Sequence, residues 1–295
     1  MDTDNGGSLN RKTLRNLDVT PKMATGDRPM IELSRRCVIA LLICAAAGRL
    51  RAQEPAAQES YQQWLAKRTE ELESYQFALE GTPPEALTME PRSLLNWSNP
   101  ERGTAAGAVF LWTQGGQPAM IACAFGRGQW LKHEFHSLSD RPLIGERSGS
   151  RVHRFAPGIE WHELTGAPVP AASRPLRLTQ MRRQVERFEV SIVALKMGKA
   201  EPAVMRLLSQ PVYRSPETAE GDTALFLFVQ GTDPEGVLTL QATADKKWRY
   251  ALSRQTKAVV KAKLDDKQVL DLPIWKAEPD SAFFVVTPPE ATAGM

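Results

Sequence analysis

The chain has 295 residues, of which 37 are Lys or Arg and 34 are Asp or Glu, so its net charge is only +3 at neutral pH. Residues 1–52 hold nine basic and five acidic side chains, and subtracting this net +4 leaves about −1 for residues 53–295. A domain that binds nucleic acid carries a clustered excess of basic residues. The charge balance therefore argues against nucleic acid as a partner.

Residues 30–52 have the layout of a bacterial export signal. Arg35 and Arg36 precede an apolar run of about 12 residues, Cys37 to Gly48, and the small residue Ala52 stands directly before a polar stretch. A helix that spans a bilayer needs roughly 20 residues. We therefore expect cleavage before Gln53, with no stable transmembrane anchor, and a periplasmic or secreted protein.

The sequence is compatible with more than one export route. The arginine pair and the Ala-rich core resemble a twin-arginine signal, but Val38, Ile39 and Ala40 stand where Phe-Leu-Lys is usual, so general secretion is the main alternative and an uncleaved membrane anchor the lesser one. Residues 1–29 are polar without periodicity, and we expect either a disordered leader or a true start at Met30.

Only one cysteine follows the signal, so the mature chain cannot form an intramolecular disulfide. Cys123 lies in the segment PAMIACAF, in which alternation places it on one face of a strand with Ile121 and Phe125. We interpret it as a small buried apolar side chain.

Two segments of the chain read almost alike. GAVFLWTQGGQP begins at residue 107 and TALFLFVQGTDP at residue 223, and an offset of 116 residues aligns 93–118 with 209–234. Nine positions are then identical: Ser93/Ser209, Pro100/Pro216, Glu101/Glu217, Ala108/Ala224, Phe110/Phe226, Leu111/Leu227, Gln114/Gln230, Gly115/Gly231 and Pro118/Pro234. This spacing predicts an internal duplication.

The same offset aligns two segments with helical periodicity. Residues 57–80 and 176–196 each place apolar side chains on one stripe, so the sequence predicts a long helix in each half. Each helix is followed by apolar segments around Gly-rich or Asp-Pro turns, which are typical of antiparallel strands. Further strands are expected around the segments WLKHEFHSL, WRYALSRQ, RVHRF, IEWHEL, AVVKAKL and QVLDLPI.

The predicted fold class is therefore α+β. We expect two tandem repeats, residues 53–166 and 167–286, each a long helix packed on a four- to five-stranded antiparallel sheet, with a disordered tail at 287–295. The halves are either separate domains or joined through their sheets, and the short linker LTGAPVPAASRP favours joining because lone sheets would leave edges uncovered.

This order of a helix and then a sheet resembles the cystatin-like and NTF2-like folds, and in tandem it resembles the β-lactamase inhibitory proteins. The segments HEFHSLS and GTDPE are also similar to parts of uncharacterised exported bacterial proteins of unknown function. The first resemblance concerns topology, and the second implies no activity.

All four histidines lie within 30 residues, in the first half. Imidazole is a common zinc ligand, but HEFH is not HExxH, and on a strand His133 and His136 point to opposite faces. His136 with Glu134, joined by His153 or His162, could still converge on a metal or act in acid/base chemistry. Ordinary hydrogen-bonded histidines on a sheet are the favoured interpretation, so no metal and no cofactor is predicted.

Other catalytic motifs are missing from the sequence. There is no G-x-S-x-G elbow, Walker motif or G-x-G-x-x-G fingerprint. Aromatic residues at positions matched between the halves indicate core roles, whereas Trp161 and Trp275 lie outside the matched region and could stack on a flat ligand.

The asymmetry between the halves suggests where a specific site lies. Ala251 and Arg254 stand in the second half where the first has His133 and His136. We therefore predict a binding face on the first half, formed by Glu134, His136, His153 and Trp161.

The favoured function is a non-catalytic binding or scaffold module of the cell envelope, with an envelope protein or a small molecule as partner. An NTF2-like pocket enzyme is the alternative, followed by a metal-dependent hydrolase that uses the histidines.

Overall fold

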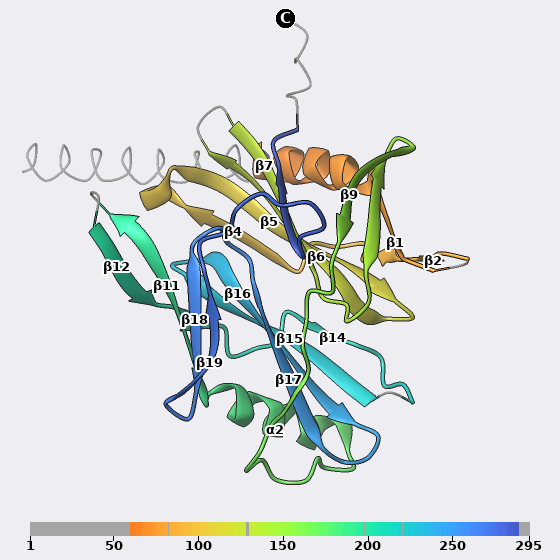
Figure 1. Ribbon diagram of the computed structural model, residues 1–295, viewed down its shortest axis with the longest axis vertical. Helices are drawn as coiled ribbons and strands as arrows, with labels where there is room; N and C mark the ends of the chain where they lie inside the picture. The colour runs from red at the N-terminus through yellow and green to blue at the C-terminus, as the bar shows by residue number, and fades with distance from the viewer. Residues whose placement is uncertain (1–59, 82, 128–129, 197–198, 220, 289–295) are drawn as a thin grey trace, which may run out of the picture. The chain divides into compact units, whose positions relative to one another are not determined.

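The computed structural model describes residues 60–81, 83–127, 130–196, 199–219 and 221–288 (Figure 1). The predicted leader, the export signal and the cleavage point before Gln53 lie outside these residues, as does most of the predicted tail. None of the helices in the described part combines the length and the apolar character needed to cross a bilayer.

The predicted fold class is wrong, because the described residues are mostly β-strand and include no long helix from either half. The first helix covers residues 60–73, and the second, α2, covers Arg174–Val185. The remainder of each predicted helix is a strand, β1 (Tyr75–Leu79) or β11 (Phe188–Lys196).

Alternation of apolar residues explains why these segments are strands. Tyr75 and Leu79 are four residues apart, so they fit a helical stripe and a strand face equally well. Phe77 decides between the two, because it is buried with them while Gln76 between them is exposed. In β11, Val190 does the same between Phe188 and Ile192. The β-branched and aromatic residues of both segments also favour strands.

The first half contains two antiparallel sheets. One has the order β2-β1-β8-β9, with β2 at Glu85–Ala86, β8 at Leu143–Arg147 and β9 at Ser150–Phe155. The other is built on three long strands, β5 (Thr104–Gln114), β6 (Gln117–Arg127) and β7 (Trp130–Ser137). Two short strands, β3 (Thr88–Met89) and β4 (Leu95–Asn99), pair with β5, and a 3₁₀ turn at Pro100–Arg102 follows β4.

The second half has the same order of elements and the same pairings. After α2 come β11, β12 (Lys199–Val204), β13 (Arg206–Leu207), β14 (Tyr213–Arg214), β15 (Gly221–Gln230), β16 (Asp233–Thr243), β17 (Trp248–Arg254), β18 (Val259–Leu264) and β19 (Lys267–Leu272). They form a sheet β12-β11-β18-β19 and a sheet on β15, β16 and β17. Figure 1 shows α2 against β16, which it contacts. Common descent of the halves stays a prediction.

Each half also gives one strand to the other. Strand β10 (His162–Glu163), at the end of the first half, pairs with β17, and β20 (Phe283–Val286), at the end of the second half, pairs with β7. These exchanges complete two six-stranded sheets and cross the predicted boundary between residues 166 and 167. The covered edges protect β7 and β17 from pairing with other chains.

Side chains of the two six-stranded sheets meet in one apolar cluster. Val109 and Leu111 of β5 lie in it, while Phe110 and Trp112 point to the other face, toward the four-stranded sheet of their own half. The long strands are thus buried on both faces, which explains their nearly continuous apolar sequences. The central cluster contains Trp97, Val109, Leu111, Ile121, Cys123, Leu138, Leu225, Leu227, Val229 and Val237.

Two positions illustrate how tightly this cluster is packed. A Cβ atom on Gly107 would lie 2.2 Å from Cε2 of Trp97, so no larger residue fits there. Cys123 is buried in the cluster, and this burial raises the pKa of its thiol. A thiol with a raised pKa is a poor nucleophile, so its role is packing.

Candidate functional site

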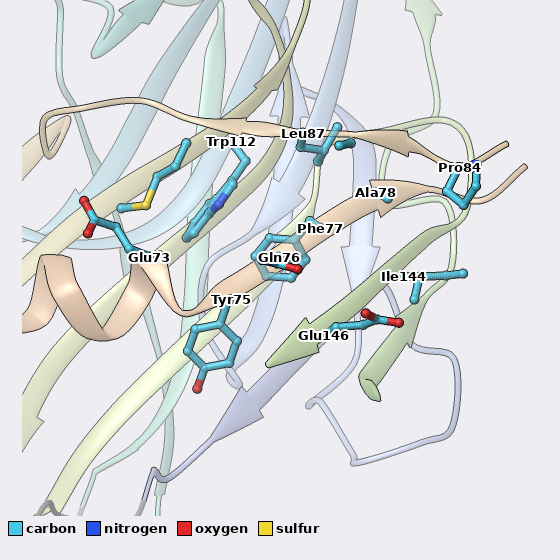
Figure 2. A pocket seen from close by; sticks show the side chains of 12 residues that line it. Glu73, Tyr75, Gln76, Phe77, Ala78, Pro84, Leu87, Trp112, Ile144 and Glu146 are labelled. Carbon is cyan, nitrogen blue, oxygen red and sulfur yellow. The ribbon is translucent and has the colours of Figure 1, made fainter. Parts of the chain in front are cut away.

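The first half contains an apolar groove of about 540 Å³, which we call the β1 groove (Figure 2). It lies along β1, between β8 and the segment that carries β2 and β3. Its lining comprises Glu73, Tyr75, Gln76, Phe77, Ala78, Pro84, Ala86, Leu87, Met89, Trp112, Ile144 and Glu146. Its volume falls in the usual range for small-molecule sites.

Buried aromatic residues and carboxylates line different parts of this groove. Tyr75, Phe77 and Trp112 are buried, and the rings of Phe77 and Trp112 meet edge to face at 5.0 Å. Glu73 is exposed and Glu146 is half-buried, and neither forms an ion pair with a described residue. The groove thus combines an apolar wall with unpaired negative charge.

A chain of polar side chains lies behind the aromatic wall. The Tyr75 hydroxyl and Nδ1 of His133 are 3.3 Å apart, and Nε2 of His133 is 3.5 Å from a carboxylate oxygen of Glu71. Burial, with Arg147 and Arg68 nearby, lowers the pKa of His133 to about 3. Burial also raises the pKa of Tyr75. In Figure 2 the Tyr75 hydroxyl points away from Phe77 and Trp112.

The predicted residues Glu134 and His136 lie on the face of β7 opposite to His133. Nε2 of His136 donates a hydrogen bond to the carbonyl of Gly158 at 3.2 Å, and its ring lies 5.9 Å from that of Phe283 in β20. Burial is the main cause that lowers the pKa of His136 to about 4. His136 is therefore neutral at pH 7.

Glu134 is buried near two acidic residues of β16. Burial raises the pKa of Glu134 to about 8, and the charges of Glu235 and Asp233 add to the effect. The pKa of Glu235 is raised to about 7 by burial and by Asp233, although Arg102 contacts both acids. Arg102 of the first half thus forms ion pairs with Asp233 and Glu235 of the second half.

His153 and Trp161 lie elsewhere. His153 stacks on Phe284 with ring centres 4.3 Å apart, and its Nε2 donates to the carbonyl of Ser281 at 3.0 Å. The guanidinium of Arg249 covers Trp161 at 4.1 Å, beside a polar cavity of about 310 Å³ that both residues line. The four predicted residues therefore do not converge on one site.

A third cavity, of about 520 Å³, which we call the junction cavity, lies where residues of both halves meet. His136 of β7 lines it together with Arg254 of β17 and Trp275, so it unites two residues singled out in the sequence. Its remaining lining residues are Pro157, Gly158, Ile159, Glu160, Leu252, Ser253, Leu270, Leu272, Ser281, Ala282 and Phe283.

The sequence analysis predicted neither the β1 groove nor the junction cavity. The β1 groove requires β1 to be a strand, and the alternation in YQFAL was the available signal. Arg254 was noticed only as the counterpart of His136. Its position at the end of an apolar strand indicated a buried charge.

In the described residues, no three His, Cys, Asp or Glu side chains are placed to hold a metal ion. Comparison of the sequence with family models and curated proteins, and of the fold with solved structures, gave no match. The resemblance to tandem cystatin-like or NTF2-like units rested on the order of a helix followed by a sheet; the described helices are shorter than predicted, and the resemblance stays a prediction.

Proposed function

We propose that the chain is an exported, non-catalytic binding module whose β1 groove holds a small amphipathic molecule with an apolar body and a cationic ammonium group. The observation that carries this proposal is the pairing of an apolar groove of about 540 Å³ with carboxylates that have no ion pair among the described residues.

Apolar burial supplies the affinity in this proposal. Each methylene group that leaves water contributes about 0.8 kcal/mol, and the half-buried side chains of Ala78, Leu87 and Ile144 offer apolar surface that receives it. Glu73 and Glu146 then favour a cationic head over an anionic one. An ammonium group near aromatic rings gains further from cation–π attraction.

The chain of Tyr75, His133 and Glu71 argues against the alternative of a pocket enzyme. A general base works best when its pKa lies near the operating pH, whereas the pKa of His133 is about 3. The raised pKa of Tyr75 likewise keeps its hydroxyl protonated. These side chains fit a structural role inside the core, where the Tyr75 hydroxyl and Nδ1 of His133 form a hydrogen bond.

Calorimetric titration with octyltrimethylammonium, octyl sulfate and octyl glucoside tests the proposal. The cationic probe should bind most tightly, the neutral probe more weakly and the anionic probe least. Equal binding of the cationic and anionic probes would contradict the predicted head group, and binding of none at millimolar concentration would contradict the site.

Two variants locate the bound probe. Ala78→Trp should fill the groove and abolish binding, because Ala78 lines it and is only half-buried. The double variant Glu73→Gln with Glu146→Gln should weaken binding of the cationic probe about 5- to 30-fold, because each exposed charge pair contributes up to about 1 kcal/mol. Glu278→Gln is the matched control, since Glu278 is exposed and outside the groove. Unchanged binding in Ala78→Trp would place the probe elsewhere.

A further inference from the structure

The junction cavity contains a buried cation without a counter-ion. Arg254 is only 6% exposed, and the hydrogen bond recorded for its side chain goes from Nη2 to the carbonyl of Pro273 at 2.7 Å. Its Nη1 has no hydrogen-bond partner among the described residues, and no described carboxylate forms an ion pair with it. Leaving a buried charged donor unpaired is costly.

Arg177 shows how the same protein satisfies an equally buried arginine. It is also 6% exposed, but its Nε donates to Asp222 at 2.9 Å and its Nη2 to Glu217 at 2.5 Å. The carbonyls of Ala171 and Ala172 accept from its Nη1 at 3.0 and 2.7 Å. Every guanidinium nitrogen of Arg177 has a partner, two of them carboxylates, whereas Arg254 lacks the anion.

His136 brings an unused acceptor to the same cavity. A carbonyl can only accept, so Nε2 of His136 carries the proton in its bond to Gly158, and the neutral ring leaves Nδ1 as an acceptor. Nδ1 is buried without a partner among the described residues. Both His136 and Arg254 line the cavity, and the charge of Arg254 contributes, after burial, to the lowered pKa of His136.

The rest of the cavity is suited to an apolar body. Leu252, Leu270, Leu272 and Trp275 line it. Lys257 lies over the Trp275 ring at 5.0 Å and adds positive charge, while Glu160 is the one acidic residue of the lining and is exposed. No lining residue is shared with the β1 groove.

We propose that the junction cavity is a second binding site, in which Arg254 binds the carboxylate of a small organic acid and His136 accepts a hydrogen bond from a hydroxyl group beside that carboxylate. The apolar part of the acid lies against the leucines and Trp275. Nη1 and Nδ1 are themselves closed off from water, so the acid reaches them through a small rotation of the two side chains.

Calorimetry at pH 7 with mandelate, mandelamide and phenylacetate tests the chemistry. Mandelamide lacks the negative charge and should bind about 10- to 100-fold more weakly than mandelate, the range of a hydrogen bond to a charged group. Phenylacetate lacks the hydroxyl and should bind about 2- to 10-fold more weakly, as for one neutral hydrogen bond. Equal binding of mandelate and mandelamide would overturn the role of Arg254.

Variants assign each contact. Arg254→Met keeps the reach without the charge and should remove the preference for mandelate over mandelamide, whereas the control Arg183→Met, at an exposed position on α2, should keep it. His136→Phe should remove the preference for mandelate over phenylacetate. Folding of each variant is checked by thermal unfolding, and wild-type binding by a folded Arg254→Met protein would overturn the site.

The variant Glu160→Gln tests whether the anion that pairs with Arg254 is a bound ligand or the carboxylate of Glu160. If mandelate binds the wild type and this variant alike, the ligand supplies the anion, as proposed. If mandelate binds only the variant, Glu160 is the natural partner of Arg254 and the proposal is overturned.

Discussion

Strands β7 and β17 occupy the same place in the two six-stranded sheets, yet they bury different chemistry. The first carries His133, Glu134 and His136, and the second has Ala251, Leu252 and Arg254 at the matching positions. The β7 groups are largely uncharged at pH 7, because burial lowers the pKa of the histidines to about 3 and 4 and raises that of Glu134 to about 8. Arginine stays charged, so among these six matched positions the permanent charge lies on β17.

The difference teaches that a buried ionisable group has two outcomes in this fold. On β7 the groups give up their charge, which removes most of the cost of burial. On β17 the charge persists, and it needs a partner that the described residues do not supply.

The largest effect is expected from the two buried arginines. Asp222→Asn removes an anion that pairs with Arg177 and Arg214, and should lower the free energy of unfolding by about 3–5 kcal/mol. Arg254→Met removes an unpaired charge, so it should be neutral or stabilise by up to about 4 kcal/mol. Urea unfolding measures both. A loss of about 3 kcal/mol in Arg254→Met would show that Arg254 is already paired.

The apolar cores of the halves should respond alike, in contrast to their polar strands. Leu72 packs in the first core and Phe188 in the second, both buried. Leu72→Ala should cost about 2–5 kcal/mol and Phe188→Ala about 3–5 kcal/mol, measured by the same urea titration. A cost below about 1 kcal/mol in either variant would mean that its half lacks a tightly packed core.

A smaller effect should appear as a dependence of stability on pH. The pKa of Glu134 rises from its ordinary 4.5 to about 8 on folding, so between these values the folded chain holds a proton that the unfolded chain releases. Stability should therefore fall as pH rises, by about 1–2 kcal/mol between pH 6.5 and 8. Glu134→Gln should flatten this dependence.

The histidines give the opposite sign in a lower range. Below pH 6.5 these histidines bind protons in the unfolded chain, whereas buried His133 and His136 stay neutral in the folded chain. The two histidines therefore lower the stability as the pH falls. The pKa of Glu235 is also raised, to about 7, and contributes with the same sign as Glu134, so the difference between the urea midpoints of the wild type and of Glu134→Gln from pH 6.5 to 9 isolates the effect of Glu134. An equal pH dependence in the wild type and in Glu134→Gln would contradict burial of an uncharged carboxyl.

The strands were more predictable than the helices. Alternation and turn residues located β5, β6, β15 and β16 because their apolar content and bounding glycines are local signals. The ends of the helices were less predictable, because Tyr75 and Leu79 fit both the helical and the strand periodicity. The choice between helix and strand depends on pairing with the distant strand β8.

The candidate sites were less predictable still. The opposite faces of His133 and His136 follow from strand geometry alone. The separation of His153 from Trp161 does not follow from it, because it depends on the exchanged strands. Strand β20 places Phe284 against His153, and β10, which begins directly after Trp161, pairs with β17. Such pairings join residues more than 80 positions apart, and no local pattern encodes them.

The most direct test of the account is a crystal structure of the protein with 4-bromomandelate, whose bromine locates the ligand by anomalous scattering. The account predicts bromine among the apolar side chains of the junction cavity, and a carboxylate oxygen about 2.7–2.9 Å from Nη1 of Arg254. An Arg254 guanidinium paired with Glu160, with no bromine in the cavity, would contradict it.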